Sequence, residues 1–189
     1  MGSEGKLKGK KALVTGAGTG IGRAIALEFA RQGADVVLHY HGDSEMGATS
    51  AVKEIHVLGR RAVAFKADFS DTDEAVSVAI QAIEFLGGIS SLVNNVGITM
   101  NKPFLKTTPE QVDMLLNVNF RSPYFLTQRV AEYMVGHGGG TVVNLASVHG
   151  FQGAPEHSVY AATKGAIIAC TRTLAPVSEL REGRDVACS

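Results

Sequence analysis

The stretch from Ala12 to Gly22 reads ALVTGAGTGIG and decides the fold. Its first four residues form a short apolar run, which predicts a buried strand over 12–15. The glycine-rich part follows at once, and residues at helical spacing continue to Gly33, which suits a helix C-cap. The sequence therefore predicts a strand, a glycine turn and a helix in direct succession.

This succession can hold a dinucleotide. Backbone N–H groups at a helix N-terminus attract a pyrophosphate, and glycine permits the close approach that such a contact requires. The spacing here is Gly-x-x-x-Gly-x-Gly, at Gly16, Gly20 and Gly22, rather than the commoner Gly-x-Gly-x-x-Gly. Taken alone, the turn also fits a tight strand-to-helix connection without a ligand.

Strand-like and helix-like segments alternate along most of the chain. Further strands are predicted over 34–38, 62–65, 91–95 and 141–145. Helices are predicted over 43–58, from Ser70 or Asp71 to about Leu86, over 108–137 and over 157–175. This alternation predicts an α/β fold, a doubly wound, Rossmann-like parallel sheet with right-handed crossovers.

The segment 108–137 has its own start and interruption signals. Thr108 suits the N-cap position, and Pro109 suits the first helical position. Pro123 lacks an N–H group for the helical hydrogen bonds, so we expect a kink near Asn119.

Composition narrows the classes of function. The chain has 189 residues, 45% hydrophobic and 19% charged, as in a soluble globular domain. A formal net charge of zero and scattered basic residues favour neither a nucleic acid partner nor a membrane partner. The polar N-terminus does not resemble a signal peptide. Cys170 and Cys188 show no metal or disulfide pattern, so we expect a cytoplasmic protein.

Tyr160 and Lys164 stand four residues apart in the last predicted helix. This spacing puts both side chains on one helix face. An ammonium beside a phenol stabilises the phenolate, which suits an acid/base catalyst. On its own, the pair is also a common helical coincidence.

Four ordered segments resemble the short-chain dehydrogenase/reductase family over roughly residues 8 to 175, in particular its 3-oxoacyl-[acyl-carrier-protein] reductase-like members. Residues 15–22 resemble its glycine motif, and 94–97 (Asn-Asn-Val-Gly) are similar to its Asn-Asn-Ala-Gly motif. Residues 117–119 (Asn-Val-Asn) resemble the helix segment whose second asparagine is catalytic. Ser147, with Tyr160 and Lys164, resembles the active-site set.

The resemblance implies a catalytic role for each of four residues. Tyr160 would exchange a proton with the substrate oxygen, and Lys164 would tune that phenol and bind the nicotinamide ribose. Ser147 would hold the carbonyl oxygen, and Asn119 would support Lys164 through a water. Singly, the same residues also fit an exposed Tyr/Lys pair, a serine that caps a turn and an asparagine that satisfies backbone groups.

The resemblance also implies a nicotinamide dinucleotide as cofactor. Its expected contacts are Gly16, Thr19, Gly20, Ile21, Gly22, Tyr40, His41, Asp68, Asn95, Gly97, Tyr160 and Lys164. Asp68 would contact the adenine, or else cap a turn or helix. NAD-specific relatives carry an acidic residue where this chain has Tyr40 and then His41, so NADP is favoured. NAD stays an alternative, because the usual arginine is missing and Asp43 lies nearby.

Four histidines lie beside these segments. His39 and His41 alternate at a strand end but have no third ligand, so no metal site is predicted and we interpret them as surface or hydrogen-bonded histidines. His149 and His157 flank the loop after Ser147, where the family shapes its substrate pocket.

The resemblance ends near residue 175, which divides the chain into a dinucleotide-binding domain over 1–175 and an atypical tail over 176–189. Pro176 is expected to end or kink the last helix. The tail lacks strand alternation, so we expect a truncated or altered-frame product without the last strands of the family fold. The fifth strand would then present an open edge.

The implied function is an oxidoreductase that transfers a hydride between NADP(H) and a ketone or secondary alcohol. A 3-oxoacyl thioester or a sugar-like polyol is the implied substrate. Relatives often oligomerise through their two long helices, so a homo-oligomer through 108–137 and 157–175 is implied. The alternative function is a catalytically silent variant that binds cofactor weakly or associates with a full-length partner.

Overall fold

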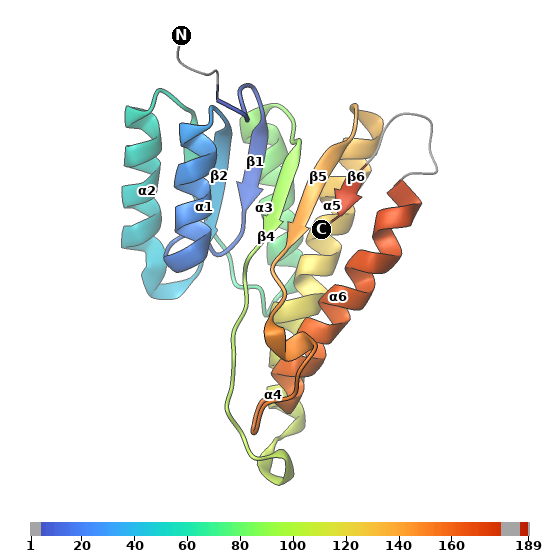
Figure 1. Cartoon of the computed structure of the whole chain (residues 1–189). Helices are drawn as coiled ribbons and strands as arrows, with labels where there is room; N and C mark the ends of the chain where they lie inside the picture. The colour runs from blue at the N-terminus through green and yellow to red at the C-terminus, as the bar shows by residue number, and fades with distance from the viewer. Residues whose placement is uncertain (1–4, 179–185, 189) are drawn as a thin grey trace.

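One parallel sheet forms the centre of the molecule, and helices cover both of its faces (Figure 1). The computed structural model describes residues 5–178 and 186–188. The strand order is β3-β2-β1-β4-β5-β6. The strands are β1 (Lys11–Val14), β2 (Asp35–Tyr40), β3 (Ala62–Lys66), β4 (Ser91–Asn94), β5 (Gly140–Asn144) and β6 (Val186–Cys188). Because the chain moves outward from β1 in both directions, the predicted doubly wound sheet is confirmed.

Two apolar cores lie on opposite faces of this sheet. Alternate strand residues point to opposite faces, so Leu13 joins one core and Val14 joins the other. The first core packs under α3 (Thr72–Leu86) and α5 (Ser122–Gly136). The second packs under α1 (Gly20–Arg31) and α2 (Glu45–Val57). Both cores hold the strand ends in fixed positions, which is what a site at those ends requires.

Most predicted elements are found within one or two residues of their expected bounds. The expected cap of α1 is displaced by one position, because Gln32 is the C-cap and Gly33 follows it with a φ of 96°. The segment predicted as one helix over 43–58 begins with a 3-10 turn, η1 (Gly42–Ser44). Asp71 caps α3 by accepting the backbone N–H of Asp73 at 2.8 Å.

The long helical segment is interrupted as expected. After α4 (Pro109–Leu116), which Thr108 caps, the chain forms a π-helical turn, η3 (Asn117–Arg121), before α5 begins. Pro123 has no N–H group to bond the carbonyl four residues back, so the regular pattern cannot continue there. The distortion places Asn119 in the interior, where its exposed fraction is zero.

The end of the chain differs from the expectations in two respects. Of the two expected effects of Pro176, it does not end the last helix, since α6 (Ser158–Ser178) continues past it, and a kink there stays a prediction. The edge of β5 is not open either, because β6 pairs with it in parallel from Gly140↔Val186 to Val142↔Cys188. Backbone pairing needs no alternation of side chains, so this short strand has no sequence signal. Residues 179–185 and 189 of the predicted tail lie outside the described residues, and its boundary at residue 175 stays a prediction.

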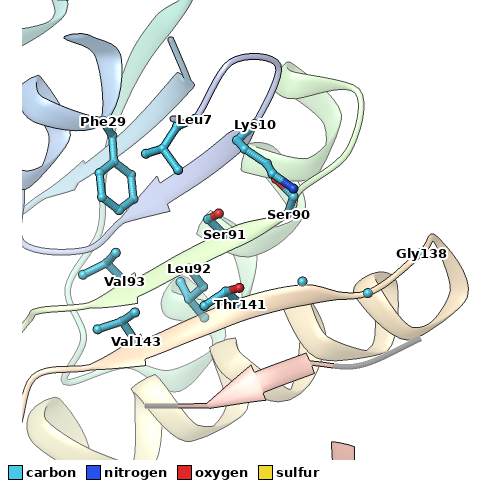
Figure 2. Close-up of a pocket in the computed structure, with 12 residues that line it drawn as sticks. Leu7, Lys10, Phe29, Ser90, Ser91, Leu92, Val93, Gly138, Thr141 and Val143 are labelled. Atoms are coloured by element: carbon cyan, nitrogen blue, oxygen red, sulfur yellow. The ribbon is translucent and has the colours of Figure 1, made fainter. Parts of the chain in front are cut away.

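A hollow of about 340 Å³ opens over β4 and β5 beside α1 (Figure 2). Its apolar walls include Phe29, Val93 and Val143. It reaches the amino ends of the strands at Ser90 and Gly138. Because α/β sheets bind their ligands at the carboxyl ends of the strands, this hollow is not the candidate active site. Within the described residues, no helix is long and apolar enough to cross a bilayer.

Candidate active site

The glycine turn lies at the carboxyl end of β1, where it leads into α1. Gly16 has a φ of 62°, a left-handed conformation that glycine adopts without strain. At Gly22 a Cβ atom would overlap the carbonyl oxygen of Gly16 and the side-chain amide of Asn95. Only glycine therefore lets the first turn of α1 pack this closely against the end of β1.

The side chain of Asn95 holds this turn from the neighbouring strand end. Its amide nitrogen donates to the carbonyl oxygens of Thr15 at 2.9 Å and Gly16 at 3.0 Å. In return, the Thr15 hydroxyl accepts the backbone N–H groups of Asn95 and Val96 at 3.0 and 3.2 Å. Asn95, which is predicted to contact the cofactor, is observed to join the ends of β1 and β4 by hydrogen bonds.

His39 supports the same turn from β2. Its imidazole is 1% exposed and stacks on Phe69 with ring centroids 4.2 Å apart. Nε2 donates to the carbonyl of Ala67 at 3.1 Å, and Nδ1 accepts the backbone N–H of Gly16 at 3.1 Å. Burial lowers the pKa of His39 to about 4, so the ring is neutral at pH 7. The sequence predicts a surface or hydrogen-bonded histidine here, and the second description is confirmed, but the bond to Gly16 has no sequence signal.

The turn fits the pyrophosphate of a dinucleotide. Thr19 makes no side-chain cap hydrogen bond, and the first turn of α1 carries no acidic residue. A Cβ atom at Gly20 would meet nothing within 4 Å, and Ile21 is 67% exposed, so the approach to the turn is open. Free N–H groups at a helix N-terminus and open space beside them are what an anion requires.

The end of β2 lies next to Asp68, so residues from both places can contact the same bound nucleotide. Tyr40 pairs in register with Lys66 on β3, which brings His41 and the residues after β3 together. His41 Nε2 lies 3.6 Å from Asp68 Oδ2. The Ser70 backbone N–H holds the pKa of Asp68 below its usual range, and the nearby imidazoles of His41 and His39 add to the effect.

Tyr160 and Lys164 lie on one face of α6, as their spacing predicts. Lys164 Nζ is 5.8 Å from the centroid of the Tyr160 ring and donates to the carbonyl of Leu145 at 2.7 Å. Lys164 is only 4% exposed, and burial lowers its pKa. The lysine therefore has a fixed position between Tyr160 and the end of β5.

Asn119 lies beside Lys164 and ties three segments together. Its side chain exchanges two hydrogen bonds with the backbone of Ile98, at 2.8 and 2.9 Å, and donates to the Thr163 hydroxyl at 3.1 Å. A Cβ atom at Gly97 would lie 3.4 Å from Lys164 Nζ and 3.6 Å from Asn119 Oδ1. Gly97, Asn119 and Lys164 thus meet at one point, and Thr163 is a supporting residue that the sequence did not reveal.

Ser147 completes the group from the end of β5. It is the N-cap of the 3-10 turn η4 (Val148–Gly150), and its Oγ accepts the backbone N–H of His149 at 3.2 Å. This bond uses one lone pair of the oxygen and does not involve the hydroxyl proton, which can still donate. The His149 ring centroid lies 6.1 Å from that of Tyr160, which places this turn beside the tyrosine.

A buried polar ladder behind the site was also missed by sequence reasoning. The Asn94 amide donates to Thr127 at 2.7 Å and to Asn144 at 2.8 Å, and Asn144 donates to Thr171 at 3.0 Å. These bonds join the ends of β4 and β5 to α5 and α6, which fixes the helix that carries Tyr160. In the part of the chain that the structure describes, no group of three or more His, Cys, Asp or Glu side chains could hold a metal ion.

A doubly wound sheet with a glycine turn after β1 is the architecture of the dinucleotide-binding α/β proteins. The family model for short chain dehydrogenases matches residues 10–182. The chain therefore belongs to the short chain dehydrogenase family, as its resemblance implied.

Curated relatives and solved structures agree with this assignment. The hydroxynaphthalene reductase-like protein Arp2 of Metarhizium robertsii is 40% identical over 170 residues, covering 89% of this chain and 62% of the relative. Trihydroxynaphthalene reductase PfmaI of Pestalotiopsis fici is 38% identical, covering 89% and 59%. The chain thus spans about three fifths of the length of these relatives.

Similar solved structures include complexes with nicotinamide cofactors. A short chain dehydrogenase from Burkholderia cenocepacia in complex with NADP has a TM-score of 0.90 and 36% identity, covering 97% of this chain and 73% of that chain. A short chain dehydrogenase/reductase from Burkholderia phymatum in complex with NAD has a TM-score of 0.89 and 29% identity, covering 97% and 65%. One protein that binds NADP and one that binds NAD therefore share this fold.

Proposed function

We propose that this protein is an NADP(H)-dependent oxidoreductase that reduces a ketone to a secondary alcohol. The observation that carries the proposal is the position of Lys164, which lies beside Tyr160 on α6 and bonds the end of β5 at Leu145. Ser147 begins the turn after β5, and the ring of His149 in that turn lies 6.1 Å from the ring of Tyr160. The family assignment supports the reaction class, and the names of the reductase relatives support the direction.

Each of the four side chains has a different proposed role in the reduction of the carbonyl group. The chemistry that a bound nicotinamide supplies is a hydride for the carbonyl carbon. Ser147 donates its hydroxyl proton to the oxygen and stabilises the charge that develops there, while Tyr160 donates the proton that completes the alcohol. Lys164, buried and charged, stabilises the phenolate that remains on Tyr160. Asn119 holds the segment after β4 against α6 and thereby positions Lys164.

The proposed cofactor preference rests on the end of β2. Tyr40 and His41 stand where NAD-specific proteins place a carboxylate for the ribose hydroxyls. His41 can donate to a 2′-phosphate, and its Nε2 atom lies 3.6 Å from the carboxylate of Asp68, the residue expected at the adenine. The NADP complex among the similar structures supports this choice, and the NAD complex keeps NAD as the alternative.

The proposed substrate is a ketone whose carbonyl group belongs to a ring system. The names of the relatives favour a carbonyl on a ring system over the 3-oxoacyl thioester or polyol that the sequence suggested. The exposed apolar side chains of Val148 and Phe151, 70% and 69% exposed, lie on the turn after Ser147 and suit such a flat substrate.

A fluorescence titration of the 189-residue chain with NADPH and then NADH tests the proposal. We expect saturable binding, tighter for NADPH, followed by NADPH oxidation when cyclic ketones are added. If the chain binds neither NADPH nor NADH, the proposal is wrong. A matched Lys164→Met variant, which loses the terminal amine but keeps an unbranched stem, should bind NADPH more weakly than the wild-type chain.

A catalytically silent role in association with a longer partner is a second candidate. It is favoured by the apolar hollow beside α1, whose walls include Phe29, Val93 and Val143. A homo-oligomer through the two long helices is also proposed, since Tyr124 and Phe125 on α5 are 39% and 38% exposed. Light scattering of the chain alone, and of the chain with a full-length relative, separates the two assemblies.

A further inference from the structure

Three aromatic rings form a triangle at the proposed reaction centre. The His149 and His157 ring centroids lie 5.2 Å apart, and they lie 6.1 and 6.2 Å from that of Tyr160. Both imidazoles stand nearly edge-on to the tyrosine ring, at 74° and 71°. The rings come from the two ends of the loop between β5 and α6, and the fold brings them side by side next to Tyr160.

Local structure fixes His157 and its tautomer. Its Nδ1 lies 2.8 Å from the carbonyl oxygen of Pro155, which can only accept, so Nδ1 carries the proton and Nε2 is left as an acceptor. The preceding residue, Glu156, has a φ of 63°, a left-handed conformation that is strained for a residue other than glycine. The backbone N–H of Lys102 bonds the Glu156 carbonyl at 2.9 Å and holds this turn in place. Strain of this kind persists where the surroundings enforce it, and it gathers at ligand sites.

His149 is held as firmly through its backbone. Its N–H donates to Ser147 Oγ, and a Cβ atom at the next residue, Gly150, would press against Ile168 and the backbone of Lys164. The turn therefore lies directly on α6. Within residues 5–178, no protein group hydrogen-bonds the ring nitrogens of His149 or Nε2 of His157.

We propose that His157, assisted by His149, recognises a hydroxyl group on the substrate, and that the substrate class is a flat ketone bearing a phenolic or enolic hydroxyl. This inference rests on the proposed reductase function. An acceptor at Nε2 needs a donor from the ligand, which a hydroxyl supplies and which an ether, an alkyl chain or a carboxylate does not. His149 can serve the same hydroxyl or a second one, because its ring accepts or donates according to tautomer.

The unpaired nitrogen of His157 affects the selectivity between substrates more than the affinity for any one of them. A half-buried acceptor left unpaired by an unhydroxylated ketone loses its water without compensation. Sites built to hydrogen-bond a hydroxyl therefore discriminate against the analogue that lacks it far more strongly than apolar pockets discriminate between sizes. One such bond corresponds to about a tenfold difference in Kd.

The test uses 1-tetralone, its monohydroxylated isomers and their methyl ethers as probes. Kd values are measured by calorimetry with the full chain and NADP⁺, and kcat/KM is measured separately with NADPH. We expect at least one hydroxytetralone to bind about tenfold more tightly than both 1-tetralone and the corresponding ether. His157→Phe keeps the ring and should bring that ratio close to one, whereas His157→Gln, which restores an acceptor, should recover part of it.

Matched controls separate this role from a general effect on folding. His137→Phe changes a histidine that stacks on Tyr133 at 3.8 Å, and it should leave the ratio unchanged. His149→Phe gives a second variant with its own expected decrease in the ratio. A ratio near one in the wild-type chain, a ratio that survives His157→Phe, or absence of any tetralone binding would each overturn the inference. Turnover without hydroxyl preference would leave the reductase function intact, and hydroxyl preference in Kd without any turnover would refute that function alone.

Discussion

His39 accepts the backbone N–H of Gly16 at its Nδ1 atom, 3.1 Å away. The bond joins the second strand to the first glycine of the turn, and Ala67 fixes the other side of the same ring. A protonated imidazole cannot accept that N–H group. The shape of the proposed pyrophosphate site is therefore linked to the charge of a buried histidine.

We predict a specific loss of stability in acid. An unfolded histidine has a pKa of about 6.5, and burial lowers the pKa of His39 to about 4. Between these values the unfolded chain binds more protons than the folded chain, so the free energy of unfolding falls as pH decreases through this window, by about 3 kcal/mol. His39→Gln keeps an acceptor and a donor but does not titrate. Urea unfolding of both proteins from pH 7.5 to pH 4 should show the difference, and parallel curves would contradict it.

The tight packing at Gly22 gives a second prediction. In Gly22→Ala the new Cβ atom would overlap the Gly16 carbonyl and the Asn95 amide, so β1 and α1 must move apart. We expect a loss of about 1–3 kcal/mol in unfolding free energy and NADPH binding weakened by more than tenfold. Gly136→Ala is the matched control, because its Cβ atom meets nothing within 4 Å. Equal melting temperatures for the two variants would refute the close approach.

How far the sequence predicted this molecule depends on the range of the interactions involved. The strands, helices and sheet class follow from local patterns of apolar residues, and the interruption near Asn119 follows from Pro123 alone. The cap of α3 at Asp71 was likewise one of two local alternatives. Such features are decided within a few residues of the chain, and the patterns reported them correctly.

Features decided by distant partners were missed. β6 exists because the backbone of Val186–Cys188 meets the edge of β5, and three residues carry no periodic signal of that pairing. His39 gains its function from Gly16 and Ala67, which lie 23 and 28 residues away. The amide of Asn95 bonds the backbone of the glycine turn, a role that only the approach of β4 to β1 defines, and its contact with the cofactor stays a prediction.

A third prediction concerns the proposed proton donor. Tyr160→Phe removes the hydroxyl but keeps the ring beside Lys164 and the two histidines. Turnover should fall by about 10²–10⁴-fold, the range of general acid catalysis. NADPH binding should persist, since the glycine turn and Lys164 are unchanged. Tyr133→Phe, on α5 beside His137, is the control and should keep full turnover; a similar loss in both variants would mean that Tyr160 acts only through stability.

The last prediction addresses the choice of cofactor. His41→Asp places a carboxylate at the end of β2, where the 2′-phosphate of NADPH is expected, beside the existing carboxylate of Asp68. Repulsion should weaken NADPH binding by at least about tenfold at low salt, while NADH binding changes less or improves, because a carboxylate there can accept from both ribose hydroxyls. Added salt should reduce the discrimination, since both groups are near the surface. Fluorescence titrations with the two cofactors measure the ratio, with His137→Asp as the distant control for charge. If the two cofactors lose affinity equally, His41 shapes the turn after β2 but does not read the phosphate, and the preference for NADP must come from another part of the chain.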